Sequence, residues 1–490
     1  MDTELRAGGK RDRAGDLLGK AVSRRRFLAR GALAVGLGAL SLDLLTACTG
    51  PTSTGPAQGG APGKPTEAAK PAGAEPTKPA AAPAAQPAAS PAAAGAPAAA
   101  PAASPAAAPA GGGQEIVVGV PVPLTGAFSE AGQNCLLAVQ HAVDDINQAG
   151  GVKALNGAQL KVSYGDTSTD NPAQAADVVR RVVGEGASAL IGAYLSSLTL
   201  PASTAAEQAQ VPMITQSFVD TLSTRGYKYF FQLPPKSSAF GTATVDYLLE
   251  IYRDAGINLT SGAMISSDDA SSKAQGEAVV QQAKAKGIDM PVAEFYPVTI
   301  ADMSPLVQKV RSAKAQAVFM TGPVPAVLLF TRTLRGLGDK TPIVGIGGGG
   351  ILDVSFPGQL GPAAEGVIAL AAWNWDLNQP GVDKIAKAYD ERNKVPFMPQ
   401  ESGESYIAAW LVHRAAENAK SSDPKKLNEA LTGLKLGSGD PIADLWPGWK
   451  IAFDSTGVND TVPLAVQYQG GVPRTVWPKE VQTAKPTVAS

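Results

Sequence analysis

The chain contains 490 residues, with 42 Lys and Arg, 43 Asp and Glu, and a formal net charge of −1. This balance excludes the basic field that attracts nucleic acid or an anionic membrane surface. The two cysteines, Cys48 and Cys135, and the two histidines, His141 and His413, exclude a disulfide framework and a multi-cysteine zinc site. Because no Ser-His-acid, Cys-His or metal-ligating pattern is visible, we expect no catalysis, no bound metal and no cofactor.

Residues 1–48 have the pattern of a bacterial export signal. The segment Ser23–Leu28 reads SRRRFL, which fits the twin-arginine pattern, and the apolar stretch Gly31–Leu42 follows it. That stretch is shorter than the roughly 20 apolar residues that a membrane-spanning helix needs, and its length suits a signal peptide. The next motif, Leu45–Cys48, resembles a lipobox. We therefore expect diacylglyceryl attachment to the Cys48 thiol and cleavage before it.

Residues 49–113 consist mainly of Ala, Pro, Gly and Thr in short repeats. The prolines oppose a continuous helix and favour extended polyproline II segments. Bulky apolar side chains are too few to form a core. At about 3.1 Å per residue such a segment would reach at most roughly 200 Å. We interpret it as a disordered tether between a lipid anchor and a folded body.

From Gln114 onward, short β-branched runs alternate with amphipathic helical patterns. This alternation predicts an α/β fold with parallel sheets that helices cover on both faces. In such sheets, ligands bind beyond the carboxyl ends of the strands, so functional residues are expected directly after each strand. The expected strands are Ile116–Val120, Leu160–Tyr164, Ala189–Ile191, Val211–Thr215, Ala263–Ser266, Ala293–Tyr296, Ala317–Met320 and Pro342–Ile346.

An ordered set of motifs resembles the periplasmic leucine/isoleucine/valine-binding proteins, which are type I solute-binding proteins of ABC importers. The resemblance implies two doubly wound parallel-sheet lobes joined by a three-crossing hinge, with the ligand in the cleft between them. It places residues 114–233 and 371–450 in the N-terminal lobe, and residues 234–370 and 451–480 in the C-terminal lobe. The motifs are Val118–Gly126, Ala142–Asn147, Tyr164–Thr167, Ile191–Ala202, Thr224–Tyr227 and Asp302–Val307.

The resemblance further implies a function and partners. It predicts a lipoprotein, anchored through Cys48 at the outer face of the cell membrane, that captures a branched-chain amino acid or a related small carboxylate or amide. The expected partners are the permease subunits of an ABC importer; we expect a monomer that binds no nucleic acid. One alternative is a ligand-sensing subunit of a membrane receptor. Another is a dinucleotide-dependent enzyme, because Gly345–Gly350 matches G-x-G-x-x-G, although Pro357 soon interrupts the following segment.

The first expected ligand loop contains Ser196 and Ser197, which follow a strand and precede a helix. Hydroxyls and free backbone N–H groups at a helix start can receive a carboxylate. In the resembled family, the serine that matches Ser196 contacts the carboxylate of the ligand. The alternative is ordinary helix capping. Tyr194 is a further candidate for the wall of the cleft.

The second expected loop is Ser217, Phe218 and Val219, after the strand that ends at Thr215. The family usually has a threonine near Val219 that holds the amino and carboxylate groups of the ligand, and valine cannot replace it. Phe218 is expected to pack against an apolar part of the ligand, or else in the core.

The C-terminal lobe offers Asp269 as a hydrogen-bond acceptor, and Trp373, near the second hinge, as a stacking or packing residue. Gly347 and Gly348 stand in the loop where the family carries an acid for the ligand ammonium. A buried ammonium group without partners is costly. We therefore expect weak discrimination for an α-amino group, unless Asp220, Asp268 or Asp269 supplies the acid.

Overall fold

The computed structural model describes residues 115–347 and 349–488. The expected export signal, Cys48 and the expected tether lie outside this range. Within it, no helix has the length and apolar composition needed to cross a membrane.

The first lobe is built on a five-stranded sheet in which neighbouring strands run parallel, in the order β2-β1-β3-β4-β5. The side chains of Ile116, Val118 and Val120 are fully buried. Helices cover such a sheet on both faces, which is why the first strand reads as an almost continuous apolar run. The elements are β1 (Ile116–Val122), α2 (Ser129–Gln148), β2 (Leu160–Asp166), α3 (Gln174–Gly184), β3 (Ala187–Ile191), α4 (Ser196–Ala209), β4 (Met213–Thr215) and β5 (Phe230–Gln232).

The second lobe contains a seven-stranded sheet in the order β14-β13-β10-β9-β8-β6-β7. Along the part of the sheet that runs β10-β9-β8-β6-β7, each strand pairs in parallel with its neighbour. This parallel pairing agrees with the sequence prediction. The elements are α5 (Ser237–Asp254), β6 (Ser261–Ser267), α6 (Ala270–Ala285), β7 (Asp289–Tyr296), α7 (Ser304–Ala313), β8 (Val318–Thr321), α8 (Val324–Gly336), β9 (Ile343–Gly345), α9 (Ser355–Leu360) and β10 (Ile368–Ala371).

An antiparallel hairpin, β13 (Leu464–Gln469) and β14 (Val472–Trp477), completes this sheet and was not among the predicted strands. Its two-residue turn is Gly470-Gly471, in which both residues have positive φ. Two adjacent positive φ angles suit the tight turn of a β-hairpin, and glycine adopts them without steric cost.

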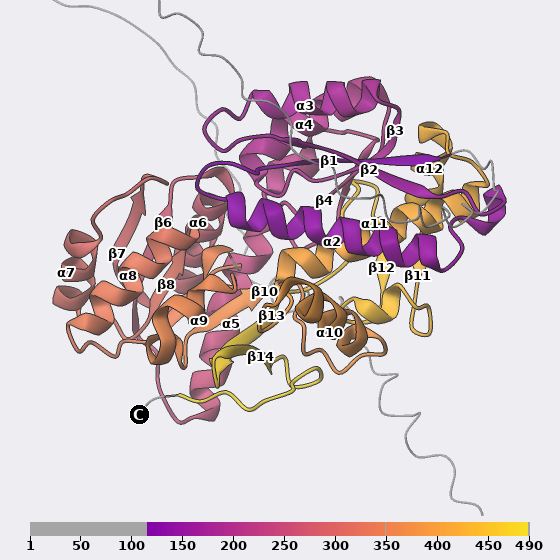
Figure 1. The fold of residues 1–490 in the computed structure, drawn as a ribbon. Coiled ribbons are helices and arrows are strands. Elements are labelled where there is room, and N and C mark those ends of the chain that lie inside the picture. Colours follow the sequence, from indigo (N-terminus) through magenta and orange to yellow (C-terminus); the bar gives the residue numbers. More distant parts are fainter. Residues whose placement is uncertain (1–114, 348, 489–490) are drawn as a thin grey trace, which may run out of the picture. The chain divides into compact units, whose positions relative to one another are not determined.

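After β10 the chain returns to the first lobe through α10 (Val382–Asn393), α11 (Gln400–Ala419) and α12 (Pro424–Thr432). Helix α11 packs along α2 (Figure 1). Two hydrogen bonds join these helices: the Tyr406 hydroxyl donates to Asp145 at 2.8 Å, and Asn134 Nδ2 donates to Glu401 Oε1 at 3.0 Å. This return brings residues near position 400 beside residues near position 130.

The chain passes between the lobes after β5, after β10 and after β12 (Ile451–Ala452), which pairs with β11 (Lys435–Leu436). The first and third crossings lie side by side. The backbone N–H of Gln232 donates to Gly457 O at 2.7 Å, and that of Asn459 donates to Gln232 O at 2.9 Å. Two α/β lobes with three crossings agree with the predicted fold class.

Candidate ligand-binding site

A small cavity lies between the lobes, at the carboxyl ends of β1, β3, β8 and β9. Its volume is about 10 Å³, which is about the space of one water molecule, so a larger solute requires the lobes to move apart. We call it the inner cavity. The first lobe contributes Ala127, Phe128, Glu130, Ala131, Tyr194 and Glu401, and the second contributes Val324, Gly349, Gly350 and Asp353.

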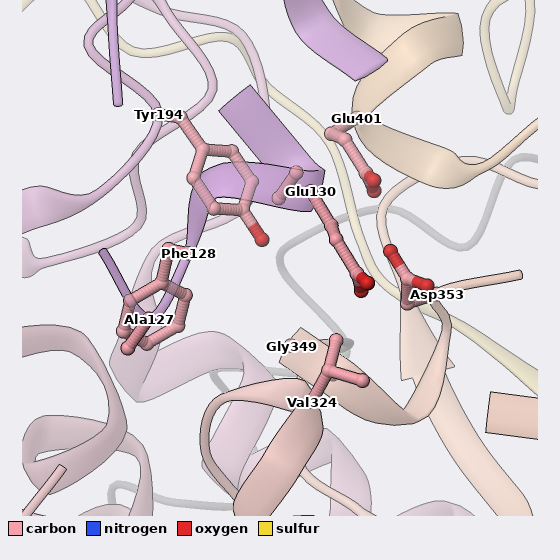
Figure 2. A pocket seen from close by; sticks show the side chains of 10 residues that line it. Ala127, Phe128, Glu130, Tyr194, Val324, Gly349, Asp353 and Glu401 are labelled. Carbon is pink, nitrogen blue, oxygen red and sulfur yellow. The ribbon is translucent and has the colours of Figure 1, made fainter. Parts of the chain in front are cut away.

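Three carboxyl groups reach this cavity from different elements. Glu130 lies in the first turn of α2 and Glu401 in the first turn of α11, while Asp353 follows the short helix η3 (Gly349–Ile351). Figure 2 shows their carboxyl groups and the Tyr194 hydroxyl pointing into the same space. The site therefore combines acceptors from both lobes.

Ser355 forms hydrogen bonds with two of these carboxyl groups: that of Asp353 in its own lobe and that of Glu130 across the cleft. Asp353 Oδ1 accepts from the backbone N–H and the hydroxyl of Ser355, at 2.8 and 2.6 Å. The same hydroxyl also lies 3.2 Å from Glu130 Oε2, so Ser355 links the two lobes. The other oxygen, Asp353 Oδ2, is buried and accepts no N–H or hydroxyl hydrogen bond among the described residues, but the carboxyl groups of Asp353 and Glu130 are close enough to share a proton.

Burial and mutual repulsion alter the acidity of this cluster. Burial raises the pKa of Glu401 to about 8, and the charges of Asp353 and Glu130 add to the effect. Burial and the charge of Asp353 also raise the pKa of Glu130. One helical turn beyond Glu401, the fully buried Glu404 has no hydrogen-bond partner for either carboxyl oxygen among the described residues, and burial raises its pKa well above the usual range. At neutral pH the cluster therefore retains protons.

A wider outer groove of about 430 Å³ adjoins the inner cavity and shares Ala127, Glu130 and Val324 with it. This volume falls within the range of small-molecule pockets, roughly 300–1,000 Å³. The remaining lining is mostly apolar: Gly126, Ser129, Ile300, Ala301, Pro325, Leu328, Leu329, Arg332 and Gln359.

Of the residues predicted from the sequence, Tyr194 lines the inner cavity. Burial and the nearby charge of Glu401 raise the pKa of its hydroxyl, which therefore remains protonated. Ser196 is buried in the first turn of α4, and its Oγ accepts from the backbone N–H groups of Phe218 and Val219, at 3.3 and 3.2 Å. Ser196 thus ties the two predicted ligand loops to each other, and Ser197 beside it is half-buried.

The side chains of the second predicted loop are engaged in contacts with other parts of the protein. The Ser217 hydroxyl donates to Tyr194 O at 2.7 Å. The ring of Phe218 packs against that of Phe240, with 4.8 Å between ring centroids, and Val219 is buried. In this conformation the loop supports the wall that carries Tyr194.

Asp269 and Gly347 are not among the residues that line the inner cavity. Asp269 caps α6 by accepting from the backbone N–H groups of Ser271 and Ser272. Gly347 has φ +70°, and a Cβ there would lie 2.9 Å from the amide group of Gln275. Gly348 lies outside the described residues.

Trp373 is fully buried, and its indole N–H donates to Leu445 O at 2.8 Å. The motif Gly345–Gly350 leads into the short 3₁₀ helix η3, whereas a dinucleotide fingerprint opens a long helix. This placement argues against the dinucleotide-dependent alternative.

Sequence reasoning missed Glu130, Asp353 and Glu401. Asp353 closely follows the glycine-rich loop after β9, and Glu130 closely follows the loop after β1. Both therefore occupy the positions beyond strand ends where ligands bind. Glu401 could not be found in that way, because it follows no strand and reaches the cavity only through the return of α11 to α2.

Comparisons with known proteins place the chain in a family. The model of the periplasmic binding protein family matches residues 115–450. Leu/Ile/Val-binding protein homolog 8 of Brucella abortus is 24% identical over 383 residues, which cover 76% of this chain and 92% of that protein. The leucine-, isoleucine-, valine-, threonine- and alanine-binding protein of Pseudomonas aeruginosa is 28% identical over 325 residues, covering 64% of this chain and 82% of that protein.

Solved structures show the same fold. A branched-chain amino acid transporter substrate-binding protein from Streptococcus pneumoniae, in complex with isoleucine, matches 74% of this chain and 100% of its own, with a TM-score of 0.64 and 23% identity. A solute-binding protein from R. palustris, in complex with benzoate, matches 77% of this chain and 98% of its own, with a TM-score of 0.64 and 17% identity. With a family model that extends over residues 115–450, this chain belongs to the periplasmic binding proteins, a family of binding proteins rather than enzymes.

Proposed function

We propose that this protein is the extracytoplasmic receptor of an ABC importer and captures a small solute between its two lobes. The observation that carries the proposal is the inner cavity, to which each lobe contributes polar side chains, including Tyr194 and Glu401 from the first and Asp353 from the second. A solute that contacts both sets of residues stabilises the closed form, in proportion to its greater affinity for that form.

The relatives define the first solutes to test. The Pseudomonas relative is named for binding five amino acids, and the structural relatives hold isoleucine in one case and benzoate in another. Branched-chain amino acids and small carboxylates or amides are therefore the starting set for this protein. A location outside the cytoplasm follows from membership of the family.

A solute from this set is expected to stabilise and compact the folded body. A ligand at 100 times its Kd raises the free energy of unfolding by about 2.7 kcal/mol. We expect a higher thermal midpoint and, for residues 114–490, a smaller radius of gyration by small-angle scattering. If no amino acid, amide or carboxylate changes either quantity, the proposed function is wrong.

We also propose that a lipid anchor holds the protein at the membrane surface, with residues 49–113 as its tether. The lipobox-like Leu45–Cys48 motif supports this proposal. Replacing Cys48 with Ala is expected to abolish labelling by a radioactive or clickable fatty acid, because the thiol is the site of attachment. Cys135→Ala is the matched control, since that cysteine is buried in the folded body. Fatty-acid labelling of Cys48→Ala would refute the anchor.

A further inference from the structure

We propose that Glu130 and Asp353 form a proton-dependent latch between the lobes, which favours the closed form at acidic pH and weakens as the pH rises. This inference rests on the proposed solute capture and adds its regulation, because a solute enclosed between the lobes leaves only when they separate. The latch joins protein groups to each other and needs no group of the solute.

The latch residues come from different lobes and meet across the cleft. Glu130 belongs to the first lobe and Asp353 to the second, and their carboxyl groups are close enough to share a proton. The Ser355 hydroxyl contacts both groups, at 2.6 Å from Asp353 Oδ1 and 3.2 Å from Glu130 Oε2. This hydroxyl has a single proton, so the direct contact between the carboxyl groups requires another. Without that proton, the two carboxylates repel each other.

The two carboxyl groups differ in their access to water. Asp353 is 4% exposed, whereas Glu130 is an exposed residue at the start of α2. A buried carboxylate oxygen without a donor is unfavourable, and a proton on Glu130 supplies the donor for Asp353 Oδ2. Because Glu130 reaches solvent, this proton can exchange while the lobes are closed.

The titratable groups around the latch are carboxyl, thiol and phenol groups. They are Glu401 and Glu404 on α11, Cys135 on α2, Tyr194 before α4, Tyr389 on α10 and Tyr468 on β13. None of the described residues that line the inner cavity is Lys or Arg. Arg332, which lines the outer groove, donates to Gln359 O at 3.2 Å and to its Oε1 at 3.1 Å. A proton, rather than a cationic side chain, therefore offsets the repulsion.

The direction of the pH effect follows from the two states of the lobes. In the closed form, burial and the charge of Asp353 raise the pKa of Glu130 above its ordinary value of 4.5. When the lobes separate, water solvates both carboxyl groups and the shift is lost. Closure therefore takes up a proton. It is most favourable below pH 4.5, and it loses up to about tenfold per pH unit from there to the raised pKa.

The test measures the separation of the lobes in the full chain by double electron–electron resonance. Spin labels are attached at two exposed positions, Asn171→Cys in the first lobe and Gln308→Cys on α7 in the second. The background is Cys48→Ser, and Cys135 is buried. Without solute, we expect a shorter distance to be more populated at pH 5.5 than at pH 8. The ratio of the two populations should change by at least about tenfold.

Two variants mimic the protonated latch. Glu130→Gln and Asp353→Asn each place an N–H donor between the lobes that does not depend on pH, so each should keep the shorter distance populated at pH 8. The control Glu429→Gln makes the first of these substitutions at an exposed position of α12, and should follow pH as the unmodified protein does.

A third variant weakens closure without changing an ionisable group. Val298 of the second lobe packs against a core cluster of the first lobe that includes Phe128. Val298→Ala should therefore favour the longer distance by the same factor at both pH values. This result would show that the response to pH belongs to the latch and not to closure in general.

Solute affinity is the second readout. Leucine, isoleucine and benzoate are titrated by calorimetry at pH 5.5 and pH 8. A solute that binds should bind at least about tenfold more weakly to the unmodified protein at pH 8, because closure then costs more. Glu130→Gln should reduce this difference to less than about threefold.

The outcomes separate the latch from the proposed function. If the distances do not depend on pH, or if Glu130→Gln and Asp353→Asn both respond as the unmodified protein does, the latch is refuted, and solute capture stands where a solute binds. If the distances change with pH but the affinity of a bound solute does not, the regulatory role is refuted. If the distances change as expected and no solute of any class binds, the latch stands and solute capture fails.

Discussion

Replacing Glu401 with Gln is expected to raise the free energy of unfolding by about 3 kcal/mol at pH 7. Glu401 is 5% exposed, and burial, with the charges of Asp353 and Glu130, raises its pKa to about 8 from an ordinary value of 4.5. At pH 7 the folded protein therefore binds a proton that the unfolded chain has released. Gln retains the acceptor for Asn134 Nδ2 and has no ionisation to suppress.

The sign of the pH dependence follows from the direction of the shift. A folded pKa above the unfolded one means that stability falls as pH rises, over the window from about 4.5 to about 8. The advantage of Glu401→Gln should accordingly grow from about 1 kcal/mol at pH 5 to about 4 kcal/mol at pH 8. Urea denaturation of both proteins at the two pH values measures it. The control is Glu429→Gln, the same substitution at an exposed position of α12. A difference that does not depend on pH would contradict the ionisation argument.

Because Glu401 also lines the inner cavity, the same substitution is expected to weaken solute binding, so that the variant gains stability and loses affinity. Strained or desolvated groups at functional sites commonly cost stability. A gain in stability and a loss of solute affinity in one variant would identify Glu401 as a functional rather than a structural acid.

Replacing Trp373 with Ala is expected to lower the free energy of unfolding by about 4 kcal/mol. The side chain is fully buried and donates to Leu445 O. It packs so closely against α11 that a Cβ on Gly403 would lie 2.3 Å from the indole ring. Removing the ring leaves a cavity and an unpaired carbonyl group, and Ala cannot compensate for either.

Urea denaturation again measures the effect, with two comparison variants. Trp410→Ala removes a half-buried indole from the same helix that Trp373 contacts, and should cost less. Trp373→Phe retains most of the packing and should keep solute affinity within about threefold, because the structure places Trp373 outside the inner cavity. If Trp373→Phe instead loses much of its solute affinity and little of its stability, Trp373 stacks on the ligand, which is one of the two roles that the sequence suggested.

The alternation of strands and helices was predictable from the sequence because its causes are local. A strand such as β1 is nearly all apolar since both its faces are buried, and a helix such as α2 shows its core-facing stripe in the 3.6-residue period of its apolar residues. The ordered motifs from Val118 to Val307 then indicated two lobes and a cleft. The antiparallel hairpin β13–β14 was missed, although its Gly470-Gly471 turn is a local signal.

The inner cavity depended on the tertiary structure. Glu130, Asp353 and Glu401 are far apart in the sequence, and their juxtaposition requires the packing of α11 on α2 and the contact between the lobes. Conversely, Ser196, Asp269 and Trp373 have residue types that suit ligand binding, yet the fold engages them in loop, cap and core contacts. Side-chain type and position after a strand are visible in the sequence. The hydrogen-bond partner of each polar group is not visible in the sequence, because that partner comes from a distant part of the chain.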